Sequence, residues 1–152
     1  MMETSIDIRT LNGLIATTLD SVDGYTTAAE DSQSGRFRQM FLDRASERRT
    51  VVETLRAEVA RQGGNPEDDG TLLAGAHRAF LNLKATVTGQ DDESIVAEVE
   101  RGEDHIKAKF ERALEDGSLD SATCTVISEA YRSVKEGHDQ MRDLKHALEG
   151  NA

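Results

Sequence analysis

Apolar side chains recur along most of this chain at alternating spacings of three and four residues. This spacing places them on one face of a helix and is typical of helices that pack together in a bundle. The pattern predicts long helices over about 5–31, 36–62, 91–115 and 118–148. A shorter apolar face predicts a further helix over about 71–88.

Residues that cap or stop helices mark the ends of these segments. Ser5 is a suitable N-cap for the first helix, and Ser118 is predicted to cap the last. Gly63 suits the left-handed position after the second helix, and Pro66 cannot continue it. The predicted helices therefore have plausible starts and stops in the sequence itself.

The lengths of the connections indicate how the helices are arranged. Short turns follow the first and third long helices, so each turn makes an antiparallel hairpin. The segment between the hairpins is too long for a turn, and its helix over about 71–88 is predicted to be a crossover. We expect one all-α domain over residues 1–152, an up-down four-helix bundle with a helical crossover and thus the ferritin-like topology.

Charge and composition narrow the classes of partner. The chain has 29 acidic and 18 basic residues, a net charge of −11, which repels nucleic acid and anionic membranes. Neither is expected as a partner. No apolar run approaches the roughly 20 residues of a membrane span, and the first residues do not resemble a signal peptide. We therefore expect a soluble cytoplasmic protein.

Cys124 is the one cysteine of the chain. It cannot form a disulfide within the chain, and a zinc site built on cysteines is excluded. A passive thiol is the favoured interpretation over a redox role.

Charged residues interrupt the apolar stripes near the middle of two predicted helices. Arg44 and Arg48 lie on the inward face of one, and Glu103 lies on the inward face of another. Tyr25 and Tyr131 can add hydroxyl groups at the edges of the stripes. The favoured interpretation is a buried ion-pair network, since an inward arginine needs a carboxylate and would repel a metal ion.

The alternative is a metal site, because ferritin-like bundles bind two metal ions in this layer. Such a site takes a Glu from each of two helices and a Glu-x-x-His from each of the other two. The chain has no Glu-x-x-His: Thr50 follows Glu47 where a histidine is needed, and Lys135 precedes His138 where a glutamate is needed. A partial iron or manganese site remains open. Its candidate ligands are Asp23, Glu47, Glu100, Glu103 and His138.

Several sequence strings resemble one family over nearly the whole chain. The strings are Gly63-Gly64-Asn65-Pro66-Glu67-Asp68, His77-Arg78-Ala79-Phe80-Leu81-Asn82-Leu83-Lys84-Ala85, Glu100-Arg101-Gly102-Glu103-Asp104 and His138-Asp139-Gln140-Met141-Arg142. With them the chain resembles short bacterial ferritin-like four-helix-bundle proteins of unknown function. The resemblance implies the fold and a stress-linked bacterial setting, and it implies no established reaction.

Two function classes follow from these observations. The preferred one is a non-catalytic bundle protein whose metal centre is replaced by a polar network. The alternative is a metal-binding ferritin-like protein that oxidises iron. His77 is more simply explained as a boundary residue of the crossover helix than as a ligand. Leu42, Leu81 and Val96 lie outside the main stripes, and they either cover the crossover helix or form a face for a homodimer or protein partner.

Overall fold

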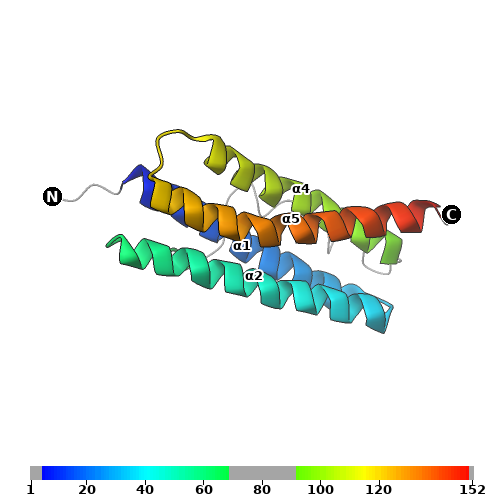
Figure 1. Cartoon of the computed structure of the whole chain (residues 1–152). Helices are drawn as coiled ribbons and strands as arrows, with labels where there is room; N and C mark the ends of the chain where they lie inside the picture. The colour runs from blue at the N-terminus through cyan, green and yellow to red at the C-terminus, as the bar shows by residue number, and fades with distance from the viewer. Residues whose placement is uncertain (1–4, 69–91, 151–152) are drawn as a thin grey trace.

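The structure, a computed structural model, describes residues 5–68 and 92–150. These residues form the helices α1 (Ile6–Asp31), α2 (Gly35–Arg61), α4 (Asp92–Glu115) and α5 (Ser121–Gly150), with no strand among them (Figure 1). The prediction of an all-α four-helix bundle is confirmed. The helix expected over 71–88, with His77 and Leu81, lies outside the described residues.

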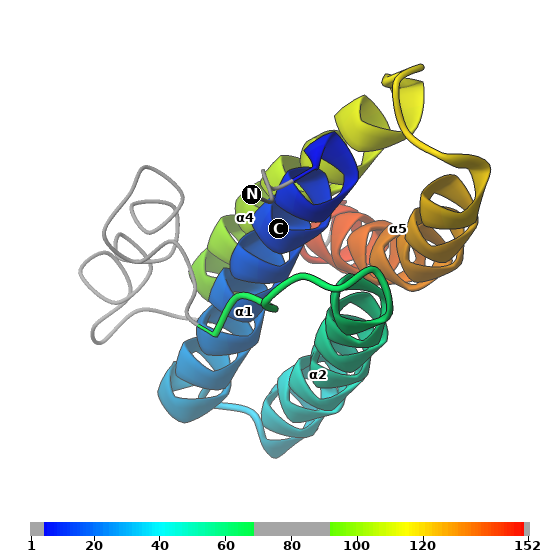
Figure 2. The same cartoon turned by 90° about the vertical axis from the view of Figure 1, so that its left-hand side faces the viewer.

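The four helices pack as a square when the bundle is viewed toward one end (Figure 2). Each hairpin pairs two helices closely, α1 with α2 and α4 with α5, and the hairpins meet through α1 against α4 and α2 against α5. Helices α2 and α4 therefore lie across the diagonal of the square. A contact between these two helices must pass through the axis of the bundle.

Hydrogen bonds fix the opposite ends of the bundle and so define its topology. At one end, the Asp92 carboxylate accepts from the backbone N–H groups of Gln33 (2.8 Å) and Ser34 (3.1 Å). At the other end, the Asn12 side chain donates to the carbonyl of Asn65 (3.1 Å) and accepts from the N–H of Glu67 (2.8 Å). Helices α2 and α4 therefore start at the same end and run in the same direction (Figure 1).

Two helix termini match their sequence signals, and one helix start does not. The Ser5 hydroxyl accepts from the Ile8 N–H (3.1 Å), and Gly63 has a φ of 87°, as expected for the residue after a helix. The prediction that Ser118 caps the last helix is wrong. Its N–H and hydroxyl both donate to the Asp116 carboxylate inside the turn, and α5 begins only at Ser121.

The apolar core has two parts with a charged layer between them. The part toward the start of α1 contains Leu11, Ile15, Leu55, Val59, Ile106, Phe110, Ile127 and Val134 among others. The other part contains Tyr25, Ala28, Phe41, Ala45, Ile95, Val99 and Met141 among others. The largest fully buried side chain of the described residues is Arg48, which lies between the two parts on α2.

Candidate functional site

A buried ion pair crosses the centre of the bundle. Arg48 of α2 donates from Nη1 to Oε1 of Glu103 (2.7 Å) and from Nη2 to Oε2 (2.6 Å). The side chains are 0% and 2% exposed. Because the two hydrogen bonds are parallel, both carboxylate oxygens are engaged by the planar guanidinium. The pair therefore has the geometry of a strong bidentate contact, and it connects the two diagonal helices.

The same guanidinium also contacts the remaining two helices. Nη1 donates to the hydroxyl of Ser21 on α1 (2.7 Å), and Nη2 lies 3.3 Å from the carbonyl oxygen of Val134 on α5. A buried charge needs partners because it has lost its hydration. Here α1, α4 and α5 each supply one, so Arg48 joins all four helices in one layer.

Gly137 provides the space for this layer on α5. A Cβ at this position would lie 3.0 Å from Oε2 of Glu103 and still closer to Nη2 of Arg48. Any side chain would therefore displace the ion pair. The absence of a side chain at this one position allows the α5 backbone to pass directly over the buried charges.

Tyr25 lies against the ion pair on α1. Its ring centroid is 5.6 Å from Cζ of Arg48, within the range of a cation–π contact. Burial, and then the negative charge of Glu103, hold the pKa of Tyr25 well above its ordinary value. Burial would lower the pKa of Arg48, but the neighbouring Glu103 carboxylate raises it above its ordinary value. Arg48 is therefore charged and Tyr25 neutral at neutral pH.

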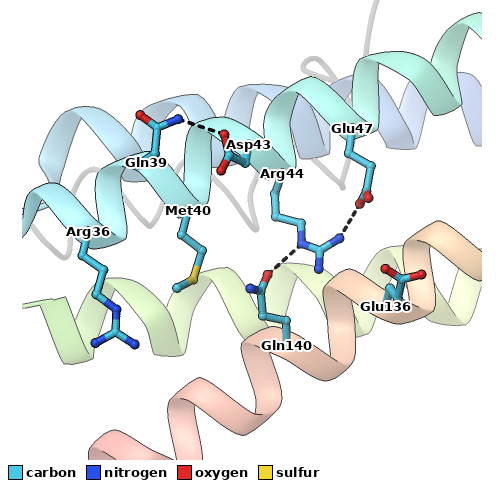
Figure 3. Close-up of a pocket in the computed structure, with 8 residues that line it drawn as sticks. All are labelled: Arg36, Gln39, Met40, Asp43, Arg44, Glu47, Glu136 and Gln140. Atoms are coloured by element: carbon cyan, nitrogen blue, oxygen red, sulfur yellow. Dashed lines mark hydrogen bonds and ion pairs between the residues drawn. The ribbon is translucent and has the colours of Figure 1, made fainter.

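Arg44, which was expected inside the same network, reaches a surface groove instead. Its Nε donates to Oε1 of Gln140 (2.7 Å) and its Nη1 to Glu47, as Figure 3 shows. The groove has a volume of about 510 Å³ and lies between α2 and α5. The aliphatic part of Arg44 approaches the central layer: its Cδ atom would lie 3.5 Å from a Cβ placed on Gly137.

Tyr131 also lies away from the central pair. Its hydroxyl donates to Oε2 of Glu111 (2.5 Å), which Lys107 contacts as well (2.8 Å). Burial, together with the hydrogen bond and charge of Glu111, raises the pKa of Tyr131 to about 12. Of the five residues expected in the polar core, the structure therefore brings Tyr25, Arg48 and Glu103 together, and it places Arg44 and Tyr131 elsewhere.

The candidate metal ligands do not all converge on one point. Asp23 is exposed on α1, and Glu47 pairs with Arg44 at the groove. Glu103 has both oxygens occupied by Arg48. Glu100 and His138 do approach each other, outside the central layer.

Glu100 and His138 meet together with Asp104. One ligand atom from each of these side chains lies within 4.8 Å of the others. The Nε2 atom of His138 is 2.7 Å from Oδ1 of Asp104, and its Nδ1 atom is 3.2 Å from Oδ1 of Asp139. Lys135 donates to Asp139 (2.7 Å), and this bond, followed by the one to His138, lowers the pKa of Asp139 to about 2.

Four residues of these two sites were not identified from the sequence. Ser21 and Gly137 contact the central ion pair, and Asp104 and Asp139 contact His138. Asp104 follows Glu100 by one helical turn, a spacing that places two side chains on one face. That spacing is the signal that could have identified it. The role of Gly137 has no such signal, because it depends on which side chain lies opposite it in the folded bundle.

The described helices and the comparisons with known proteins define the class of this protein. It is an all-α four-helix bundle, and none of its described helices has both the length and the apolar character that crossing a membrane requires. Residues 7–116 match the family described as "Domain of unknown function (DUF2383)", so the chain belongs to that family. The matched residues include Arg48 and Glu103 but end before α5. No curated protein matches the chain.

Proposed function

We propose that this protein is a non-catalytic, ferritin-like bundle in which a buried ion pair occupies the layer where ferritin-like proteins bind their metal ions. The observation that carries the proposal is the Arg48–Glu103 pair, fully buried at the axis of the bundle. The resemblance of its sequence strings to bacterial ferritin-like proteins supports a cytoplasmic, stress-linked role in a bacterium. In that role the protein would act through binding, either to a second copy of itself or to another protein.

The positive charge of Arg48 argues against a metal ion at the centre of the bundle. A guanidinium in a low-dielectric interior strongly repels a divalent cation placed within a few ångströms. Both oxygens of Glu103 already accept hydrogen bonds from Arg48. A metal ion there would have to displace a cation that has partners on three other helices.

The direction of the helices supports the ferritin-like part of the proposal. Every pair of neighbouring helices is antiparallel, and the diagonal pair α2 and α4 is parallel (Figure 1). That arrangement is the one obtained when two hairpins are joined by a single long crossover.

The rival function is iron oxidation at a central site, and it is tested directly. Purified protein is incubated aerobically with iron(II), the formation of iron(III) is followed by absorbance, and retained metal is measured by elemental analysis after desalting. We expect oxidation at the rate of a protein-free control. Oxidation above that rate, abolished in Glu103→Gln but retained in Asp104→Asn, would establish a central metal site and overturn the proposal.

A further inference from the structure

We infer that the seam between α4 and α5 carries a binding site for one first-row divalent metal ion, with Glu100, Asp104 and His138 as its ligands. The site goes beyond the proposed function and does not depend on it, because it uses none of the residues of the central ion pair. It lies on the outer side of the same two helices, where Asp104 follows Glu103 and His138 follows Gly137.

The spacing of the side chains is suitable for a single ion. Glu100 and Asp104 are one turn apart on α4 and therefore share a face, and His138 comes from the neighbouring helix α5. Their ligand atoms lie within 4.8 Å of one another. Ligands bound to one ion at about 2 Å are roughly 3–4 Å apart. Small rotations of Glu100 and the exposed Asp104 are enough to reach that spacing.

His138 is held in the orientation that a metal ligand needs. It is 8% exposed, and Asp139 contacts its Nδ1 atom while Nε2 points at Asp104. A carboxylate on the far ring nitrogen is the usual support of a metal-bound histidine, since it fixes the tautomer and the ring orientation. Lys135 in turn holds Asp139 in place.

The carboxylates around the site favour a cation, and basic groups lie at its edge: Lys145 beside Glu100, and Lys135 and Arg142 on Asp139. Asp104 and Asp139 lie beside the imidazole, and Glu100 completes the cluster. Lys145 opposes binding, because its Nζ atom lies 3.6 Å from Oε1 of Glu100. That distance is longer than a hydrogen bond, so Lys145 can move away at small cost. Replacing it should therefore tighten metal binding.

The ligand set indicates the class of metal. One imidazole and two carboxylates suit Zn²⁺, Mn²⁺ or Fe²⁺, whereas Mg²⁺ prefers oxygen ligands alone. Three protein ligands leave coordination positions for water on the side where Asp104 is exposed. We therefore expect an exchangeable ion at the surface that ties α4 to α5.

Titration calorimetry with ZnCl₂ and with MnCl₂ tests the site on the whole protein, in about 0.15 M salt with excess Mg²⁺ to occupy weak acidic sites. We expect one Zn²⁺ per chain. Asp104→Asn and His138→Gln should each weaken binding at least tenfold, and Lys145→Gln should strengthen it. The matched control is the double variant Asp143→Asn/His146→Gln, an exposed acid and histidine on α5, which should bind as the unaltered protein does.

Asp104→Asn is the deciding variant, because this side chain is 59% exposed and its replacement does not threaten folding. Circular dichroism checks that His138→Gln is folded. Co²⁺ supplies a second readout, since its visible spectrum should change in the unaltered protein and not in Asp104→Asn. No Zn²⁺ binding, or a loss of affinity smaller than tenfold in Asp104→Asn, would overturn the inference.

Discussion

Gly137 of α5 and Arg48 of α2 are in direct opposition: a Cβ on the glycine would overlap Nη2 of the arginine. The guanidinium of Arg48 therefore packs directly against the backbone of α5. The same Cβ would lie 3.0 Å from Oε2 of Glu103. A small change on α5 should thus disturb charges that belong to two other helices.

Gly137→Ala tests this relationship. Alanine normally stabilises a helix by up to about 1 kcal/mol relative to glycine. Here we expect the opposite sign, a loss of about 1–3 kcal/mol in the free energy of unfolding, because the added methyl group overpacks the site. Urea unfolding followed by circular dichroism measures the change.

Gly13→Ala is the matched control. Gly13 lies within α1, and no atom would lie within 4 Å of a Cβ at that position. This variant should gain stability by about 0.5–1 kcal/mol. If both variants shifted the urea midpoint in the same direction, the close approach of Gly137 to the ion pair would have no energetic weight.

Removing one member of the ion pair should be costly. Glu103→Gln leaves the buried guanidinium of Arg48 without its counter-charge, which costs about 3–5 kcal/mol of unfolding free energy. The double variant Arg48→Met/Glu103→Leu removes both charges and should be close to the unaltered protein or more stable. Chemical unfolding of Arg48→Met, Glu103→Leu and the double variant gives the coupling energy between the two positions.

Glu47→Gln is the control for Glu103→Gln. Glu47 pairs with Arg44 at the groove, and its side chain is 37% exposed. An exposed pair of this kind contributes less than about 1 kcal/mol. If Glu103→Gln lowered the free energy of unfolding as little as Glu47→Gln does, Arg48 would not depend on the charge of Glu103, and the prediction would be wrong.

Local sequence signals predicted the helices well because they depend on neighbouring residues. The hydroxyl of Ser5 and the backbone of Gly63 act within one turn of their own helix. Ser118 failed as a cap because Asp116, two residues away, takes its hydroxyl. The helical pattern thus fixed element type and failed where a near neighbour competes.

The candidate site was harder to predict because it depends on small rotations of whole helices. Arg44 and Arg48 are one turn apart, yet the first reaches Gln140 at the surface and the second reaches Glu103 inside. His138 lies beside the apolar stripe of α5 in the sequence pattern, but its contacts with α4 bury it. Which flank becomes interior is decided by the neighbouring helix, and periodicity in one helix does not contain that information.

Asp7 should matter for the start of α5. Its carboxylate is buried and accepts from the N–H of Asp120 (3.1 Å) and from the hydroxyl of Thr123 (2.6 Å). Asp7→Ala leaves these donors unsatisfied, and we expect a loss of about 1–3 kcal/mol. Amide exchange measured by NMR should show faster opening of the first turn of α5, with the central residues of α4 unchanged. Uniform acceleration across all helices would contradict a local role.

The two tyrosines allow a pH prediction, because the chain contains no tryptophan to mask them. Burial and Glu111 raise the pKa of Tyr131 to about 12, and the pKa of Tyr25 is also raised. A raised pKa in the folded state stabilises the fold fully below the unfolded value of about 10. That stabilisation is lost as the pH rises from there through the folded value. The absorbance of ionised tyrosine at about 295 nm should therefore not increase near pH 10 while the helices remain folded.

Tyr25→Phe isolates the signal of Tyr131. In that background, Glu111→Gln should move the ionisation of Tyr131 back toward about 10, since the carboxylate that accepts its hydrogen bond is gone. A tyrosine that ionises at its ordinary pKa in the Tyr25→Phe protein, with helical circular dichroism intact, would refute the contact with Glu111.

The division of the central charges between the hairpins has a consequence for assembly. Arg48 belongs to the first hairpin and Glu103 to the second. If two first hairpins paired with each other, two guanidinium groups would meet in one apolar interior; two second hairpins would bring together two carboxylates. Either like-charge association is strongly disfavoured, whereas unlike halves neutralise each other. The ion pair therefore favours pairing of a first hairpin with a second hairpin, whether from the same molecule or from another copy, and opposes pairing of two first or two second hairpins.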